Sequence, residues 1–244
     1  MHQMHKPWYL QNGGARLAQD RACIAEAFPG LTYRIAEAAG RVFLDGSITL
    51  VAECGVPTPI AVRVEFPADY PQGEPRIFEV AGRFPHVSDR HFFEDGQCCL
   101  WLPPESRWNP DDPDGLCLFL EEAAVFFDQQ LVYEAEGRSE WPGAQHSHGD
   151  EGYLEFVQET LGGGRDLLAV FAPVLLGHKT GHVQSNDPCP CGSRRKYKRC
   201  HKQCVENVKR RMGSGNLQAI VGRWYTRTTE TKKDEVGLTS KHYQ

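Results

Sequence analysis

The spacing of apolar residues along the first 80 positions predicts one helix followed by several strands. Between Arg16 and Phe28 apolar residues recur at helical intervals, and Pro29-Gly30 would end that helix. Beyond residue 32 apolar and polar residues alternate at 33–35, 41–44, 47–51 and 60–66, which predicts a meander, and 76–80 is its fourth strand. We expect a turn at Asp45-Gly46 within this meander.

From residue 84 to 114 this periodicity stops. Turn formers dominate the segment, but its large aromatic residues supply enough apolar bulk to keep it ordered. Helical spacing returns at 116–133, 153–161 and 166–176, and three glycines separate the last two helices. Strands followed by helices indicate an α+β fold with an antiparallel sheet.

Composition narrows the class of protein. The chain has 244 residues, 40% of them hydrophobic, so it can bury a core. No run approaches about 18 apolar residues, which argues against a membrane span, and the first residues do not resemble a secretory signal. Nine cysteines, an odd number, favour reduced thiols in the cytoplasm over a disulfide framework. We expect Cys23, Cys54 and Cys117 to be buried.

Charge is divided unevenly along the chain. Residues 179–244 carry 15 Lys and Arg against 5 Asp and Glu, whereas residues 1–178 carry 12 against 27. With the turn-rich stretch near residue 180, this predicts a main domain at 1–176, a linker at 177–186, a small module at 187–211 and a tail at 212–244. The tail is poor in apolar residues, so we expect partial disorder unless a partner orders it.

Four metal-binding side chains lie close together in the small module. Cys189 and Cys191 flank a proline, and Cys200 precedes His201. Zn²⁺ prefers a tetrahedron of sulfur and imidazole ligands, which these four residues would complete. The basic residues between the pairs would help to hold the cysteines as thiolates. We therefore predict a structural zinc site, with Cys204 as an alternative fourth ligand and ordinary reduced thiols as the alternative interpretation.

The same segment closely resembles the SEC-C motif, a small zinc module. The matching features are Cys-Pro-Cys-Gly-Ser from Cys189, Lys-Tyr-Lys from Lys196, and Cys200-His201. The resemblance implies zinc binding and docking onto a partner protein. Tyr197 alone offers no stacking platform for bases, so we favour protein docking over nucleic acid for the basic residues 194–211.

Two adjacent cysteines lie in the irregular segment. In an extended chain, alternate side chains face opposite sides. Cys98 then shares the core face with Leu100 and Leu102. Cys99 shares the opposite face with Trp101. A thiol that does chemistry must be accessible and partly ionised, so Cys99 is the candidate nucleophile.

The order of these elements resembles the ubiquitin-conjugating-enzyme (UBC) fold. Three motifs carry the resemblance over roughly residues 15–160, namely Tyr70-Pro71 with Pro75, Gly96 with Cys99-Leu100, and Trp108-Asn109-Pro110. We therefore expect a UBC-like domain with an N-terminal helix, a four-stranded meander, an active-site segment and C-terminal helices, joined to a zinc module.

This resemblance implies a protein-conjugating enzyme. Cys99 would accept the activated, flexible C-terminus of a protein as a thioester and pass it to an amine on a target. Some bacterial members of the superfamily belong to anti-phage systems of CBASS type, where the conjugated protein is a nucleotide cyclase. No adenylation motif is visible in the chain, so activation would come from a separate activating enzyme or be bypassed.

The chain departs from the family upstream of the cysteine. Family members carry His-Pro-Asn there, but this sequence has no Asn between Asn12 and Asn109. The amide that would support the oxyanion is therefore missing or supplied elsewhere. His91 is predicted to replace the motif's histidine and to orient Cys99 or position the acyl group, with a structural histidine as the alternative. His148 would overhang the site as a flap, or lie in a solvated loop.

Other residues near the site have simpler interpretations. Asp111, Asp112 and Asp114 could hold an incoming lysine, but we favour a cluster that caps the next helix. Trp108 is expected to pack beneath the active-site segment.

Two further functions stay open. The same fold could be a non-catalytic adaptor, which the missing Asn favours and an unreactive Cys99 would support. Alternatively, the zinc module and basic tail could make the protein a docking factor for a protein, a ribosome or a nucleic acid. Binding that survives deletion of residues 1–178 and falls steeply with salt would support that function.

Overall fold

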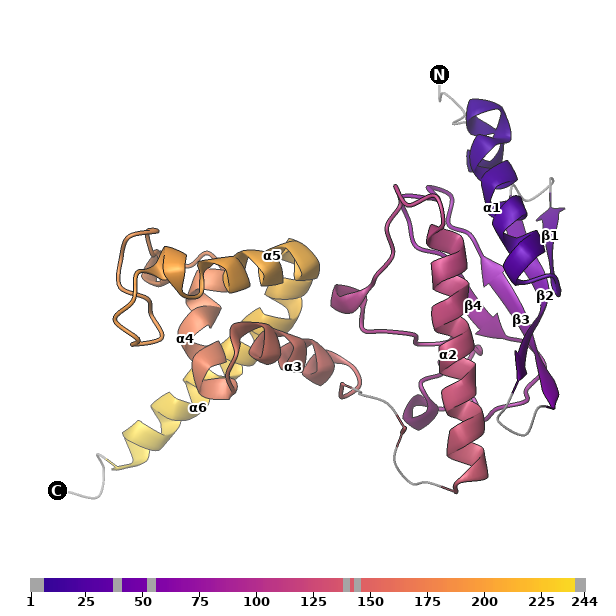
Figure 1. The fold of residues 1–244 in the computed structure, drawn as a ribbon. Coiled ribbons are helices and arrows are strands. Elements are labelled where there is room, and N and C mark those ends of the chain that lie inside the picture. Colours follow the sequence, from indigo (N-terminus) through magenta and orange to yellow (C-terminus); the bar gives the residue numbers. More distant parts are fainter. Residues whose placement is uncertain (1–6, 37–40, 52–55, 138–140, 143–145, 240–244) are drawn as a thin grey trace. The chain divides into compact units, whose positions relative to one another are not determined.

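A computed structural model describes residues 7–36, 41–51, 56–137, 141–142 and 146–239, with side chains up to residue 231. The chain forms two compact units (Figure 1). The first unit comprises residues 1–101 and 107–145, and the second comprises residues 102–106 and 146–244. This division differs from the predicted boundary at residue 176, because two of the predicted helices and a short segment after Trp101 belong to the second unit.

The first unit contains a four-stranded antiparallel sheet. Its strands are β1 (Leu31–Ala36), β2 (Arg41–Val51), β3 (Pro57–Glu65) and β4 (Arg76–Glu79). They lie in the order β1-β2-β3-β4, and each pairs with its neighbour in sequence. The predicted meander and the mixed α and β composition are confirmed.

The predicted turn at Asp45-Gly46 is wrong, because β2 runs straight through it. Gly46 has φ +148°, and a Cβ atom there would lie 2.0 Å from the carbonyl oxygen of Gly30. The glycine therefore permits a close approach between backbones rather than a turn. Asp45 is held across the strands by ion pairs with Arg34 at 3.4 Å and Arg63 at 2.7 Å.

Two helices complete the first unit, as predicted. They are α1 (Ala15–Ala27), preceded by the 3₁₀ segment η1 (Trp8–Gly14), and α2 (Gly115–Ala135). The inward residues of the sheet and of α2 share one core, in which Leu44, Val64 and Phe127 are fully buried. This burial of apolar area is the main stabilising contribution.

Helix packing also joins two cysteines. Cys23 on α1 and Cys117 on α2 form a disulfide with Cα atoms 6.4 Å apart, contrary to the expectation of reduced thiols. The two residues are 94 positions apart, so only the packing of α1 against α2 brings them together. Cys117 is buried as expected and Cys23 only half-buried. Cys54 lies outside the described residues.

The second unit is helical. It contains α3 (Asp150–Leu161), α4 (Arg165–Leu175), α5 (Lys202–Asn216), the π-helix η7 (Leu217–Gly222) and α6 (Arg223–Thr239). The two predicted helices near residues 153–176 are confirmed as α3 and α4. Among the described helices, none combines the length and the apolar character that a membrane crossing needs.

The expected partial disorder of the tail is wrong for residues 212–239, which lie in α5, η7 and α6 with a kink at Gly213. Leu217, Ile220 and Val221 are buried in the core of the second unit. Their spacing places these three residues on one face of the helix. Such a short apolar face is not visible in the average composition of the tail, on which the expectation of disorder rested. The predicted linker is also packed, since a Cβ at Gly181 would lie 2.2 Å from the backbone of Pro173 in α4.

Candidate thiol site and candidate metal centre

The segment before Cys99 is a small hairpin attached to the edge of β4. Phe92 pairs with Cys98, and the amide of Gly96 donates to the carbonyl of Phe93 at 2.9 Å, which closes the turn. On the other side, the amide of Cys98 donates to the carbonyl of Ile77 in β4 at 2.9 Å. These bonds fix the position at which the hairpin ends.

The two adjacent cysteines differ in exposure as predicted. Cys98 is 5% exposed and lies in the core, whereas Cys99 is half-buried. The amide of Cys99 donates to the carbonyl of His91 at 2.8 Å, and its Sγ atom lies 3.8 Å from the carbonyl oxygen of Trp101. Cys99 is thus the reachable thiol of the pair.

The predicted alternation continues only in part beyond the cysteines. Leu100 is half-buried against the core of the first unit, whereas Leu102 packs against the core of the second unit. The two leucines therefore do not share one core face with Cys98. The chain leaves the extended conformation after Leu100, so the period of two no longer applies.

Burial controls the ionisation of both thiols. It raises the pKa of the Cys99 thiol. Burial also raises the pKa of Cys98 well above its ordinary value, and outweighs the hydrogen bond from the amide of Glu79. At neutral pH both groups are mainly protonated, so Cys99 would react faster as the pH rises.

His91 lies beside Cys99 through its backbone. It adopts a left-handed conformation (φ +55°), which is uncommon for a residue with a side chain and often marks a functional position. Its ring contacts that of Trp141, with centroids 4.9 Å apart. The structure brings His91 and Cys99 together, and the acyl-positioning role stays a prediction.

A buried Glu–His pair near the hairpin was missed by the sequence analysis. Glu79 is 1% exposed, and its carboxylate accepts hydrogen bonds from the amides of Ala81 and Arg83 and lies 2.8 Å from Nε2 of His86. Gly96 rests on this pair, because a Cβ there would lie 2.7 Å from Cε1 of His86. The available signal was an acidic residue on the inward face of the predicted strand 76–80.

Trp108 and the acidic cluster have structural roles. Nε1 of Trp108 donates to the carbonyl of Pro71 at 2.9 Å, so this side chain secures the Tyr70-Pro71 turn, and its packing beneath the active-site segment stays a prediction. The amide of Asp114 donates to the Asp112 carboxylate at 2.9 Å in the turn that begins α2. Asp114 occupies the N-cap position of α2, but its side chain makes no capping hydrogen bond, so the predicted capping by this cluster is not borne out.

The candidate flap residue His148 and its neighbour His146 belong to the second unit. Nε2 of His146 lies 3.0 Å from a carboxylate oxygen of Glu105 and 3.9 Å from Glu159, and Nδ1 lies 3.6 Å from Glu155. His148 is exposed. His146 and these carboxylates form an ion-pair network, and the flap role of His148 stays a prediction.

The predicted zinc ligands converge in the second unit. The ligand atoms of Cys189, Cys191, Cys200 and His201 all lie within 4.8 Å of one another. Cys191 Sγ is 3.6 Å from Cys200 Sγ, and Nδ1 of His201 is 3.3 Å from Cys189 Sγ. Sulfur atoms bound tetrahedrally to Zn²⁺ at ~2.3 Å would be about 3.8 Å apart, so the set fits zinc.

Further bonds prepare this cluster for a metal. Nε2 of His201 lies 3.1 Å from the carbonyl oxygen of Leu161 at the end of α3, which leaves Nδ1 free to bind. Burial would raise the pKa of Cys191, but hydrogen bonds from Ser193 and the neighbouring thiols lower it to about 6. Cys204 is half-buried and is not a member of the converging set.

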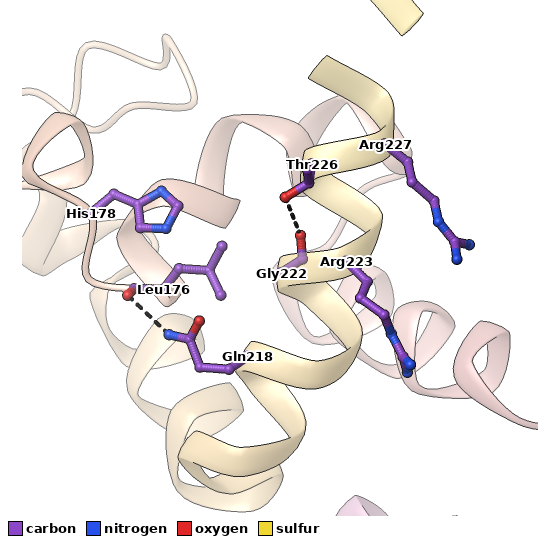
Figure 2. A pocket seen from close by; sticks show the side chains of 7 residues that line it. All are labelled: Leu176, His178, Gln218, Gly222, Arg223, Thr226 and Arg227. Carbon is purple, nitrogen blue, oxygen red and sulfur yellow. Dashed lines mark hydrogen bonds between the residues drawn. The ribbon is translucent and has the colours of Figure 1, made fainter. Parts of the chain in front are cut away.

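A cavity of about 430 Å³ lies where η7 meets α6. Figure 2 shows His178, Leu176 and Gln218 on one side of it, while Arg223 and Arg227 point away from them. Arg223 is paired with Asp150 at 2.8 Å. The polar groups do not converge on one point, so we assign no ligand to this cavity.

Comparison with known proteins identifies one part of the chain. The family model of the SEC-C motif matches residues 186–203, which include all four converging ligands. Comparison with curated proteins gives no match. Among solved structures, the chain is similar to the yeast vps23 UEV domain in complex with a vps27 PSDP peptide, at 18% identity and a TM-score of 0.38. That likeness covers 56% of this chain and 86% of the other. At this TM-score we conclude nothing about fold or function from it. The chain therefore contains a SEC-C motif and, in its other unit, a four-stranded antiparallel sheet with helices.

Proposed function

We propose that the first unit is a UBC-like, cysteine-dependent protein-conjugating domain that carries an acyl group on Cys99. The observation that carries the proposal is the pair of adjacent thiols at the end of a hairpin attached to β4. Cys98 is packed in the core, while Cys99 stays partly exposed beside His91. A buried neighbour and a reachable thiol on a fixed backbone suit a covalent carrier.

The reaction has two steps. The Cys99 thiolate attacks the activated C-terminal carbonyl of a protein, so a C–S bond forms and the bond to the activating group breaks. The nitrogen of a target amine then attacks the same carbon, the C–S bond breaks, and Cys99 regains a proton. The raised pKa of Cys99 lowers the thiolate fraction at neutral pH, so both formation and turnover would depend on pH.

The second unit would hold one structural Zn²⁺ on Cys189, Cys191, Cys200 and His201. When bound, zinc would cross-link the turn after Asp187 to the start of α5 and supply folding energy rather than catalysis. A docking role for this unit and a place in anti-phage defence are expectations from the resemblance. Both go beyond the geometry of the site.

A non-catalytic adaptor is the second candidate. Two observations favour it: burial alone raises the pKa of Cys99, and the sequence lacks the Asn of the His-Pro-Asn motif. An adaptor needs the fold but not a reactive thiol.

Intact mass after co-expression with the neighbouring genes separates the two functions. We expect a covalent adduct on the wild-type chain that is removed by thiols. In Cys99→Ser the adduct becomes a thiol-resistant ester or disappears, and the matched control Cys98→Ala retains it. A co-purifying protein without a covalent adduct, equal in wild type and Cys99→Ser, would replace the proposal with the adaptor.

A further inference from the structure

His201 connects the candidate metal centre to helices that lie outside the SEC-C motif. The motif covers residues 186–203, whereas α3 and α4 precede it in the same unit. Nε2 of His201 lies 3.1 Å from the carbonyl oxygen of Leu161, the last residue of α3. Its ring centroid lies 4.8 Å from that of Phe171, which is fully buried on α4. One of the four converging ligands is therefore built against this pair of helices.

The contact with Leu161 satisfies a backbone group at the end of α3. A helix leaves its last carbonyls without partners inside the helix. Gly162 ends α3 in a left-handed conformation (φ +76°), and its amide and that of Gly163 satisfy two of these carbonyls, at 2.9 and 3.0 Å. Neither amide reaches the carbonyl of Leu161, a residue that is only 2% exposed. Since a buried carbonyl needs a donor, His201 acts as a cap for this helix.

Whether His201 can donate to this carbonyl depends on what its other nitrogen binds. Neutral imidazole carries one N–H, and the second nitrogen is an acceptor. A metal ion held by Nδ1 needs the lone pair of that nitrogen, so the proton then lies on Nε2, which faces Leu161. Without a metal, Nδ1 can carry the proton toward Sγ of Cys189 at 3.3 Å, and Nε2 and the carbonyl would then be two acceptors in contact. Metal binding and the cap of α3 should therefore favour one another.

We propose that His201 is both a metal ligand and the C-terminal cap of α3, so that zinc binding stabilises α3 and α4 as well as the motif. A ligand that binds the capped form more tightly than the uncapped form stabilises it by linkage. Leu161, Phe171 and Cys189 belong to one hydrophobic core, which gives this stabilisation a path through packed side chains. The inference deepens the proposed function and rests on its zinc site, but not on Cys99.

The test uses the full-length chain and the variant His201→Cys. Four cysteines form a complete structural zinc set, so this variant should keep one equivalent of zinc but has no second nitrogen for Leu161. The matched control is Cys191→His, which also exchanges one ligand type for the other and keeps His201. Plasma mass spectrometry measures zinc in each protein. Amide hydrogen exchange is then compared with zinc bound and after removal of zinc by a chelator.

In the wild type we expect zinc to slow exchange of the Gly162 and Gly163 amides about fivefold, as for the gain of one hydrogen bond. The control should show the same slowing. In zinc-loaded His201→Cys the slowing of these two amides should fall below about twofold. Amides of α5, which begins at the cluster, should be slowed by zinc in all three proteins, because the metal still holds that helix.

Equal slowing of the Gly162 and Gly163 amides in the wild type and in zinc-loaded His201→Cys would overturn the inference. Absence of slowing in the wild type would overturn it whatever the variants do. A wild-type chain that binds no zinc would refute the metal centre and this inference together, whereas one equivalent of zinc without an effect on α3 would refute the inference alone. The readouts need no acyl donor, so they are independent of the proposed thioester chemistry.

Discussion

Nε2 of His86 lies 2.8 Å from Oε2 of Glu79, whose side chain is fully buried beneath the hairpin that leads to Cys99. The other carboxylate oxygen accepts the amides of Ala81 and Arg83. A carboxylate removed from water in this way needs each of its partners. The Glu79–His86 pair therefore helps to hold in place the hairpin that leads to Cys99.

Replacing His86 with alanine should destabilise the first unit by about 3 kcal/mol, because it leaves Oε2 of a buried carboxylate without a partner, while the two amides still bind Oε1. Urea unfolding, followed through exchange of β2 and β3 amides, measures this loss. The exposed His182 provides the control, and His182→Ala should change the unfolding free energy by less than about 0.5 kcal/mol. Equal effects would contradict the role of the pair.

Two glycines with left-handed backbones give a matched comparison. Gly96 has φ +86°, and an added Cβ would lie 2.6 Å from the carbonyl oxygen of Glu79. Gly82 has φ +66° with nothing within 4 Å of its added Cβ. Gly82→Ala should cost only the conformational strain, about 1 kcal/mol, and Gly96→Ala should cost at least about 2 kcal/mol more. Thermal unfolding of both variants checks this. A similar loss of stability in both would show that the hairpin shifts to make room for the Cβ atom added in Gly96→Ala.

The network around His146 should make the second unit sensitive to pH. Burial lowers the pKa of His146, but the bond to Glu105 and the charges of Glu159 and Glu155 outweigh it and raise the pKa. Since the folded pKa exceeds the unfolded value of about 6.5, this stabilisation is complete below that pH and is lost as the pH rises through the folded pKa.

His146→Gln should remove this dependence, at a cost of about 1 kcal/mol at pH 6 and almost none at pH 9. Thermal unfolding of wild type and variant at both pH values measures the difference. An equal loss of stability at pH 6 and at pH 9 would indicate that His146 stabilises the second unit through packing and not through its charge.

Metal content should depend on the four converging ligands and not on Cys204, the remaining cysteine nearby. Cys200→Ser should reduce bound zinc from one equivalent to well below one, and Cys204→Ser should leave it unchanged. Plasma mass spectrometry of the purified chains measures the zinc, and circular dichroism reports the helical content. Loss of zinc in Cys204→Ser would make that residue the fourth ligand in place of His201.

Alkylation of Cys99 should be slow at pH 7 and should rise through a midpoint above that of an unperturbed thiol, because burial raises its pKa. Cys98 should be alkylated at least tenfold more slowly at every pH, since it is buried in the core. Site-resolved mass spectrometry distinguishes the two. Equal rates would remove the distinction on which the proposed function depends.

Local patterns predicted much of this molecule. Helical spacing located α1, α2, α3 and α4, and alternation located the meander. The same alternation separated Cys98 from Cys99. The four converging side chains of the candidate metal centre could be predicted because a site built from neighbouring residues needs no knowledge of the fold.

Features that depend on distant packing could not be predicted. The Cys23–Cys117 disulfide joins residues 94 positions apart. Gly46 follows an aspartate and so looks like a turn, but it faces Gly30 on the neighbouring backbone. The segment Leu102–Ser106 is too short to carry a periodic pattern, so its membership of the second unit depends on tertiary contacts alone.

The segment Leu102–Ser106 has a practical consequence for the design of fragments that contain one unit only. Because residues 102–106 are interleaved between two stretches of the first unit, no single cut in the gene yields both units complete. A fragment ending at residue 145 would present Leu102 and Pro104 to solvent without their core, and a fragment starting at 146 would lack them. Circular permutation does not help, because the two units alternate twice around the closed chain, so residues 102–106 would have to be supplied to a 146–244 fragment as a fused or co-expressed peptide.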